Sequence, residues 1–283
     1  MNGSKLRVGI VGVGAMGRPV VDRLLAAGHE VAAYARRPEQ QEALRAIGME
    51  VAPSLAAMGA GRDFVIIYVY SDDQARVVAL DDGLVEAMDA GSMLVVHTTG
   101  SPKTVQAMAE HGTGRGVRVV DAAGSGGPTR VAQGKVMMMV GGTEEDFAHV
   151  STLLKAYADP VIHAGPLGAG QYMKLINNAL FGANMQLGIE ACRVGREFGL
   201  DIIQMAKYLG AHGSGGTAVL EMIADFGSPE RMLKTGGPFA QKDILVAQKL
   251  ADELGVDLGT IRAVNAPLLA TLEALIGPPL MPA

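Results

Sequence analysis

The sequence is organised around Gly168-Ala-Gly-Gln-Tyr-Met-Lys174-Leu-Ile-Asn-Asn178-Ala-Leu-Phe-Gly182 and its continuation to Gly199. From Gln171 to Phe198 the chain contains no proline, and apolar residues fall on all sides of a helical wheel. This pattern predicts a long helix that is buried on most sides, in contrast to an amphipathic surface helix. Strand and helix patterns alternate before it, and only helical patterns follow it.

Lys174 and Asn178 stand four residues apart and therefore share one face of the predicted helix. An ammonium on so apolar a helix is costly unless it has a partner or opens into a cleft. Such a lysine is suited to proton transfer, and an amide one turn away can hold a substrate hydroxyl or the lysine itself. The alternative is that Lys174 extends to solvent along its methylene chain and Asn178 fills a packing gap.

Composition and charge exclude several classes of protein. The 283 residues are 49% hydrophobic, which is ample for one large or two ordinary domains. A net charge of -5 without lysine or arginine runs argues against a nucleic-acid or anionic-membrane surface, so small molecules are the expected partners. With Cys192 as its single cysteine, the chain cannot form an internal disulfide. The apolar run Val8–Val13 is short and broken by glycines, which is not the pattern of a signal peptide or a membrane span. A cytoplasmic protein is expected.

The amino-terminal part begins with a strand pattern, a glycine-rich turn and a helix pattern. Residues 6–11 form the strand pattern and lead into Gly12-Val-Gly-Ala-Met-Gly17. In the dinucleotide-binding fingerprint, the first glycine allows the turn, the second close approach of the pyrophosphate, and the third helix–strand packing. A purely structural glycine turn is the alternative. The predicted cofactor-binding residues of this turn are Gly12, Gly14, Ala15, Met16 and Gly17.

The end of the second predicted strand indicates which dinucleotide is bound. NAD sites usually place an acid there, about 20 residues past the glycines, whereas an arginine accommodates the 2′-phosphate of NADP. Here the strand ends at Tyr34-Ala35 and is followed by Arg36 and Arg37, with no acid at that point. Guanidinium groups bind phosphate through charge-assisted hydrogen bonds, so NADP is predicted in preference to NAD. Two solvated arginines are the alternative.

The alternation of strand and helix patterns continues to about residue 164. It predicts a Rossmann-like α/β domain over residues 1–164, and the patterns beyond it predict an all-helical domain over residues 165–283. We expect this second domain to serve substrate binding and oligomerisation. In the second domain one helix is expected to begin at Phe239, after Gly236-Gly-Pro238.

Ligands of open α/β sheets bind outside the carboxyl ends of the strands. The loops at those ends are therefore expected to form one cleft. They are Gly12–Gly17, Tyr70–Asp73, His97–Ser101 and Asp121–Gly127.

Five stretches of the chain resemble the β-hydroxyacid dehydrogenase family, which includes 3-hydroxyisobutyrate dehydrogenases and tartronate semialdehyde reductases. The stretches are Gly12-Val-Gly-Ala-Met-Gly17, His97-Thr-Thr-Gly-Ser-Pro102, Asp121-Ala-Ala-Gly-Ser-Gly-Gly127, Gly168-Ala-Gly-Gln-Tyr-Met-Lys-Leu-Ile-Asn-Asn178 and Lys242-Asp243. The resemblance spans nearly the whole chain, and it implies a Rossmann-like domain, a helical second domain and a catalytic lysine, which would be Lys174.

The resemblance also implies roles for other residues. Asn178 would orient the substrate and the lysine, and Thr99 and Lys242 would contact the cofactor. The substrate carboxylate would be held by Ser125, Gly126 and Gly127. A hydroxyl followed by successive backbone N–H groups suits an anion, although two glycines are equally typical of an ordinary turn.

The chain departs from the family pattern around this substrate loop. The family usually has Pro-Val before Ser-Gly-Gly and small residues soon after it, whereas this chain has Ala123-Gly124 before and Pro128-Thr-Arg130 after. Ser71 stands where a proline commonly follows the fourth strand. These differences leave the substrate open: Arg130 either engages a second polar or acidic group of the substrate or is solvated.

The favoured function is an NADP-dependent oxidoreductase that interconverts a small β-hydroxy acid and its semialdehyde or keto acid by hydride transfer, with Lys174 as general acid/base. One alternative is an NADPH-dependent imine reductase on the same fold, although those relatives commonly have another residue at the lysine position. The other is a non-catalytic cofactor-binding protein. No metal site is expected. A homodimer or homotetramer is expected through the helical half, whose Leu- and Met-rich helices need more apolar surface than one domain supplies.

Overall fold

The computed structural model describes residues 5–279, and its contacts divide the chain into two compact units. The first unit ends at Lys174 and the second begins at Leu175. This division falls inside the long helix α9 (Ala169–Glu197), which matches the helix that the sequence pattern predicts. The expected domain boundary between residues 164 and 165 lies just before that helix.

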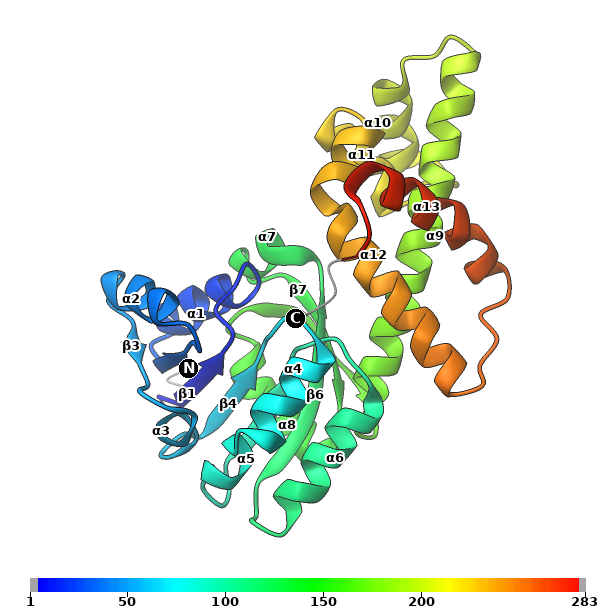
Figure 1. Cartoon of the computed structure of the whole chain (residues 1–283). Coiled ribbons are helices and arrows are strands. Elements are labelled where there is room, and N and C mark those ends of the chain that lie inside the picture. Colours follow the sequence, from blue (N-terminus) through cyan, green and yellow to red (C-terminus); the bar gives the residue numbers. More distant parts are fainter. Residues whose placement is uncertain (1–4, 280–283) are drawn as a thin grey trace. The chain divides into compact units, whose positions relative to one another are not determined.

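The first unit is built on an eight-stranded sheet with the strand order β3-β2-β1-β4-β5-β6-β7-β8 (Figure 1). Neighbouring strands pair in parallel except β6 and β7, which are antiparallel. The expected Rossmann-like α/β architecture is confirmed. The strands are β1 (Arg7–Val11), β2 (Glu30–Tyr34), β3 (Glu50–Val51), β4 (Phe64–Ile67), β5 (Met93–Val96), β6 (Arg118–Ser125), β7 (Val136–Gly141) and β8 (Ala158–Gly165).

Helices and one π-helical turn cover both faces of this sheet. They are α1 (Gly17–Ala26), α2 (Pro38–Ala46), α3 (Leu55–Gly59), α4 (Asp72–Arg76), the π-helical turn Val77–Asp81, α5 (Leu84–Ala87), α6 (Pro102–Thr113), α7 (Gly127–Ala132) and α8 (Glu144–Leu154). Val8 and Ile10 of β1 share one apolar core with α1 and α8, whereas Val11 shares the other with α3, α5 and α6. Because both faces are buried, strands such as β4 are unbroken apolar runs.

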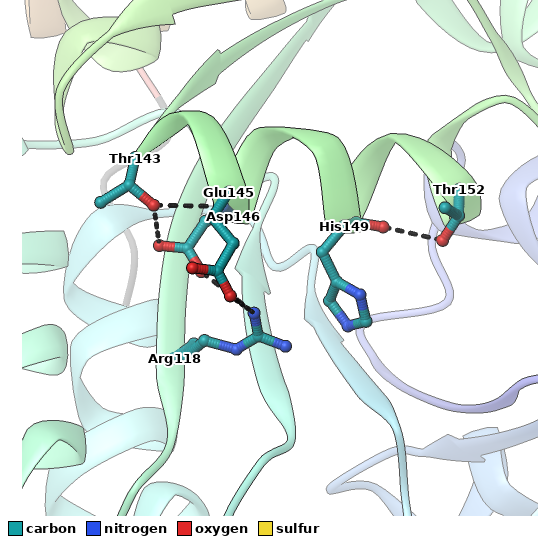
Figure 2. A network of polar contacts seen from close by, with 6 residues as sticks. All are labelled: Arg118, Thr143, Glu145, Asp146, His149 and Thr152. Atoms are coloured by element: carbon teal, nitrogen blue, oxygen red, sulfur yellow. Dashed lines mark hydrogen bonds and ion pairs between the residues drawn. The ribbon is translucent and has the colours of Figure 1, made fainter.

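Figure 2 shows how α8 is fixed to the sheet at its amino end. The Thr143 hydroxyl accepts a hydrogen bond from the Asp146 N–H at 3.1 Å and donates one to Asp146 Oδ2 at 2.7 Å. Arg118 of β6 donates to Asp146 Oδ1 at 3.4 Å. One turn further along α8, the His149 ring stacks on Phe64 of β4 with the ring centres 4.9 Å apart. The helix is thus held to the sheet at its amino end and near its middle.

The second unit is all helical, as expected. It contains α9 from Leu175 onward, α10 (Ile202–His212), α11 (Ala218–Phe226), α12 (Pro229–Glu253) and α13 (Thr260–Ile276). Its core draws on all five helices and includes Met185, Cys192, Ala206, Ile223, Ile244 and Leu268. A side chain at Gly182 of α9 would begin 2.5 Å from Ile244 Cδ1, so a glycine at this position lets α9 and α12 pack closely.

The start of α12 differs from the expectation. The helix begins at Pro229 and runs through Pro238, whereas the sequence pattern placed its start at Phe239. Gly-Gly-Pro is ordinarily a helix break. Here a Cβ on Gly237 would lie 2.6 Å from Leu272 Cδ2 of α13, so this glycine allows the two helices to approach each other. Tertiary packing of α12 on α13 therefore overrides the local tendency to break.

His97, at the end of β5, is buried and belongs to the core of the first unit. Its Nδ1 lies 2.7 Å from the Ala122 carbonyl oxygen and its Nε2 lies 2.7 Å from the Tyr157 hydroxyl. Because a carbonyl oxygen only accepts, Nδ1 carries the proton and Nε2 accepts from Tyr157. Burial lowers the pKa of His97 to about 4.

We expect the free energy of unfolding to fall as the pH drops from about 7.5 to about 4.5. The folded pKa of His97 lies below the unfolded value of 6.5, so the unfolded chain binds the proton first and stability is lost as the pH falls through this window. The loss is on the order of 2–3 kcal/mol. Urea unfolding at several pH values measures it, with His97→Gln as a non-titrating control. The stability difference between the two proteins should narrow towards low pH, and parallel curves would contradict the assignment.

Candidate functional site

A row of paired residues marks the carboxyl edge of the central strands. Across β2, β1, β4, β5, β6 and β7, the row contains Tyr34, Val11, Ile67, Val96, Asp121 and Gly141. The chain leaves β2, β1, β4 and β5 directly beyond this row. The loops that begin at Ala35, Gly12, Tyr68 and His97 therefore share one edge of the sheet, which is where ligands of such sheets bind.

The three glycines of the turn after β1 have different steric surroundings. Gly12 has φ 103°, and a Cβ on it would collide with the Tyr68 carbonyl. A Cβ on Gly17 would collide with the Gly12 carbonyl. Gly14 is exposed, and a Cβ on it would meet nothing within 4 Å. The protein's own packing thus explains Gly12 and Gly17, whereas Gly14 faces open space where a pyrophosphate would need close access to the backbone.

The amino end of α1 suits an anion. Met16, the residue before the helix, provides no side-chain cap, and the first turn contains no acidic residue. Ala15 beside it is exposed. Uncapped N–H groups and the positive end of the helix dipole favour a phosphate at this point. The turn and the helix end together fit a bound dinucleotide.

Arg36 and Arg37 lie beside this turn because β2 pairs with β1 so that Tyr34 stands opposite Val11. Both arginines are exposed. Arg37 Nε lies 3.6 Å from Glu39 Oε1, which is a weak surface pair. Arg36 makes no ion pair or hydrogen bond within the part of the chain that the structure describes. Of the two guanidinium groups, that of Arg36 is the more available to a 2′-phosphate.

Asp121 connects the edge of the sheet to the start of α9. Its Oδ1 accepts a hydrogen bond from the Gly168 N–H at 2.6 Å, and its Oδ2 accepts from the Gln171 N–H at 2.8 Å. These residues are the one before α9 and the third one inside it, so a single distant carboxylate replaces both side chains of a capping box. Burial raises the pKa of the Asp121 carboxyl, and the hydrogen bonds from the helix amides oppose that rise.

The glycines that precede Gln171 allow α9 to lie directly on the strands. Gly168 has φ 94°, a conformation that favours glycine. A Cβ on Gly170 would collide with the Met139 carbonyl of β7 and lie 2.7 Å from Asp121 Oδ2. Any larger residue at position 170 would push the helix off the sheet and lengthen the Asp121 hydrogen bonds.

Gln171 is fully buried, and its side chain forms hydrogen bonds with the backbone of the two residues that flank Thr99. Its Oε1 accepts from the Gly100 N–H at 2.9 Å, and its Nε2 donates to the Thr98 carbonyl at 2.9 Å. Sequence reasoning assigned no role to Gln171 and placed Asp121 only in a ligand-binding loop. For Gln171 the available signal was its place directly after Gly168-Ala-Gly170, where glycines permit close approach; Asp121, between Val120 and Ala122, has no comparable signal.

Lys174 and Asn178 lie on the face of α9 that also carries Gln171, at spacings of three and four residues. Lys174 is only 9% exposed and Asn178 only 5%, so burial argues against a solvated lysine. Asn177 Nδ2 donates to Asn178 Oδ1 at 3.2 Å, while Asn178 Nδ2 is buried with no hydrogen-bond partner among the described residues. A buried amide donor without an acceptor is costly, so this position fits a ligand oxygen.

The remaining predicted residues lie in both units. Ser125 ends β6, and Gly126 and Gly127 follow with φ 134° and 72°, so the backbone requires glycine there whether or not a ligand binds. A Cβ on Gly126 would lie 3.0 Å from Arg130 Cβ and Cγ, which places the stem of that exposed arginine beside the loop. Lys242 lies on α12 in the second unit, and its Nζ is 2.8 Å from Asp243 Oδ1.

A cavity of about 430 Å³ lies elsewhere on the first unit, next to Arg118, Thr143 and Asp146. Arg118 pairs with Met93 at the amino end of β5, so this cavity is not at the carboxyl edge. The Asp146 carboxylate offsets the charge of the Arg118 guanidinium (Figure 2). Residues 5–279 contain no group of three His, Cys, Asp or Glu side chains placed to hold a metal, and no helix in that range is long and apolar enough to cross a membrane.

The chain is similar to known dehydrogenases over nearly its whole length. The family described as the NAD binding domain of 6-phosphogluconate dehydrogenase matches residues 7–165, and that described as NAD-binding of NADP-dependent 3-hydroxyisobutyrate dehydrogenase matches residues 168–278. The 3-hydroxyisobutyrate dehydrogenase of Pseudomonas aeruginosa is 31% identical over 76% of this chain and 72% of its own. The L-threonate dehydrogenase of Cupriavidus necator is 30% identical over 92% and 85%.

Solved structures show the same fold. The Mycobacterium tuberculosis 3-hydroxyisobutyrate dehydrogenase, solved with L-serine, has a TM-score of 0.82 at 22% identity and covers 95% of this chain and 94% of its own. A Streptomyces aurantiacus imine reductase has a TM-score of 0.62 at 19% identity, covering 95% of each chain, which shows the fold alone. Together with the glycine turn and the Lys174 helix, the family matches show that this chain belongs to the 3-hydroxyisobutyrate dehydrogenase family of NAD(P)-dependent β-hydroxyacid dehydrogenases.

Proposed function

We propose that this chain is an NADP-dependent dehydrogenase of a small β-hydroxy acid, with Lys174 as its general acid/base. The observation that supports this most directly is the polar face of α9, where buried Lys174 lies one turn from Asn178, whose Nδ2 has no acceptor among the described residues. The nicotinamide supplies the hydride chemistry when it is bound. The protein's own task is to hold the substrate and move its hydroxyl proton.

Each part of that task has a candidate residue. Lys174 takes the hydroxyl proton during oxidation and returns it during reduction, while Asn178 orients the hydroxyl by donating from Nδ2. The Ser125 hydroxyl and the N–H groups of Gly126 and Gly127 hold the carboxylate. A carboxylate one carbon away from the carbinol carbon fits these two anchors. Arg130, beside Gly126, is a candidate for contacting a second polar or acidic group of the substrate.

The substrate class is tested with short β-hydroxy acids, their methyl esters and neutral cyclic imines, by following reduced nicotinamide absorbance. We expect kcat/KM for an acid to exceed that for its ester by about 10–100-fold, because buried donors that lose a charged acceptor cost on the order of 1.5–3 kcal/mol. Equal values for acid and ester would remove the carboxylate anchor. Efficient reduction of an imine would favour the imine reductase alternative, and no turnover at all would favour a non-catalytic protein.

Replacing Lys174 tests its role in proton transfer. Lys174→Ala should lower kcat by about 10²–10⁴-fold with NADP affinity nearly unchanged, because the proton acceptor is lost and the glycine turn is untouched. Lys174→Arg should not restore turnover, since a guanidinium keeps its proton. Lys249→Ala is a matched control, because Lys249 is largely exposed. Near-normal turnover in the alanine variant would show that Lys174 is a packing residue.

The preference for NADP is proposed from Arg36 and Arg37. Arg36→Ala should lower the ratio of kcat/KM for NADP to that for NAD by about tenfold or more, because a charge-assisted contact to the 2′-phosphate is lost. Arg37→Ala should have a smaller effect, since Arg37 is near Glu39. Arg45→Ala serves as the control, because Arg45 lies on α2, the helix that follows these two arginines, and is bonded to Gln41. An unchanged ratio in the Arg36, Arg37 double variant would reject this proposal.

A homodimer or homotetramer is proposed from an apolar stripe on α9. Ile176, Leu180 and Leu187 repeat at spacings of four and seven residues and are 58%, 46% and 56% exposed. A stripe of large, exposed apolar side chains on a helix is typical of a protein–protein interface. Light scattering at micromolar concentration should give a dimer or tetramer, and Leu187→Glu should shift it to monomer. Leu25→Glu, an exposed leucine of α1, should leave the mass unchanged; a monomeric wild type would contradict the proposal.

A further inference from the structure

The Gln171 carboxamide binds the loop after β5 in the pattern of a parallel strand. In a parallel ladder, one residue donates to the carbonyl before its partner and accepts from the N–H after it. Gln171 does the same for Thr99, since Nε2 donates to the Thr98 carbonyl and Oε1 accepts from the Gly100 N–H, both at 2.9 Å. A planar amide with two bonds of this kind fixes the backbone on either side of Thr99.

The other side of this loop is held as well. Thr98 Oγ1 accepts a hydrogen bond from the Val69 N–H at 2.9 Å, which joins the loop to the one after β4. A Cβ on Gly100 would collide with Asp72, so this part of the loop is packed against α4. Thr98 and Gly100 are buried, whereas Thr99 between them is partly exposed. The contacts around the loop thus leave the Thr99 side chain as the part that faces outward.

The backbone of Gln171 is fixed independently of its side chain. Its N–H donates to Asp121 Oδ2 at 2.8 Å, which holds the first turn of α9 on the sheet. Lys174 follows three residues later on the same face. Gln171, Thr99 and Lys174 all belong to the first unit, so the connection lies within one compact body. One side chain therefore sets the Thr99 loop relative to the helix turn that carries Lys174.

We propose that Gln171 is a positioning residue that orients Thr99 for contact with NADP and keeps that contact in register with Lys174. This inference rests on the proposed function and on the cofactor contact that the family resemblance implies for Thr99. The chemistry restricts position 171 to glutamine. Asparagine is one methylene too short to reach both backbone groups, and methionine has the length without the hydrogen bonds. Glutamate keeps the acceptor for Gly100 but, when ionised, places a negative charge against the Thr98 carbonyl.

The test measures the NADP dissociation constant of Gln171→Met and Gln171→Glu between about pH 6 and pH 8, each relative to wild type at the same pH. Gln171→Met should bind NADP about tenfold more weakly at every pH, as expected for two lost hydrogen bonds. Gln171→Glu should bind as weakly at pH 8 and recover severalfold towards pH 6, because a protonated carboxyl again donates to Thr98. Gln186→Met, on the same helix and bonded to Glu190, is the matched control with unchanged affinity.

A double-mutant cycle separates this inference from the proposed function. If Gln171 acts through Thr99, Gln171→Met should cost little further affinity in a Thr99→Ala background. Full affinity in Gln171→Met, or a lower melting temperature with unchanged NADP binding, would overturn the positioning role while Thr99→Ala still binds weakly. Full affinity in Thr99→Ala would overturn the cofactor contact and with it the inference, and Lys174 would remain subject to its own test. Should Gln171→Met fail to fold, the pH dependence of NADP binding by Gln171→Glu decides. If its affinity does not recover towards pH 6, the positioning role of Gln171 is rejected.

Discussion

The hydrogen bonds between the Asp121 carboxylate and the first turn of α9 are the interaction on which the rest of the site depends. A buried carboxylate is costly, and here the Gly168 and Gln171 amides and the positive end of the helix dipole offset that cost. The carboxylate fixes the first turn of α9 on the sheet, and together with the Met139 carbonyl it accounts for glycine at position 170, where a Cβ would meet both. Because Gln171 and Lys174 follow in the same helix, their positions are set by this contact.

The carboxyl edge of the sheet combines residues that stabilise the fold with residues that are open to a ligand. His97, directly after β5, and Asp121, within β6, both lie at this edge, yet both are buried and bonded within the protein. Gly14, from the loop after β1, is exposed and Thr99, from the loop after β5, is partly exposed at the same edge. The sequence motifs are therefore mixed in role: within His97-Thr-Thr-Gly, the first residue is buried and supports the core, whereas the third is partly exposed.

Helix α9 has buried polar and exposed apolar residues in addition to buried apolar core residues such as Met185 and Cys192. Its buried positions include Gln171, Lys174 and Asn178, whereas Ile176 and Leu187 are exposed. Gln171 holds the loop after β5, Lys174 and Asn178 are proposed to act on the substrate, and the exposed apolar groups form the stripe proposed as an interface. The apolar residues therefore fall all round the helix because one set packs within the chain and another lies on its surface.

The sequence by itself determined the Rossmann-like first domain, the glycine turn and the long helix, because periodicity and backbone sterics are local properties. The resemblance to a family, and no local pattern, suggested the roles of Thr99 and Lys242. Only the tertiary structure revealed what Asp121 and Gln171 do, since their partners lie 47 to 73 residues away and no local pattern states which distant backbone group a side chain will meet. It also decided the start of α12, where packing against Leu272 carries the helix through Gly237 and Pro238 despite their tendency to end one.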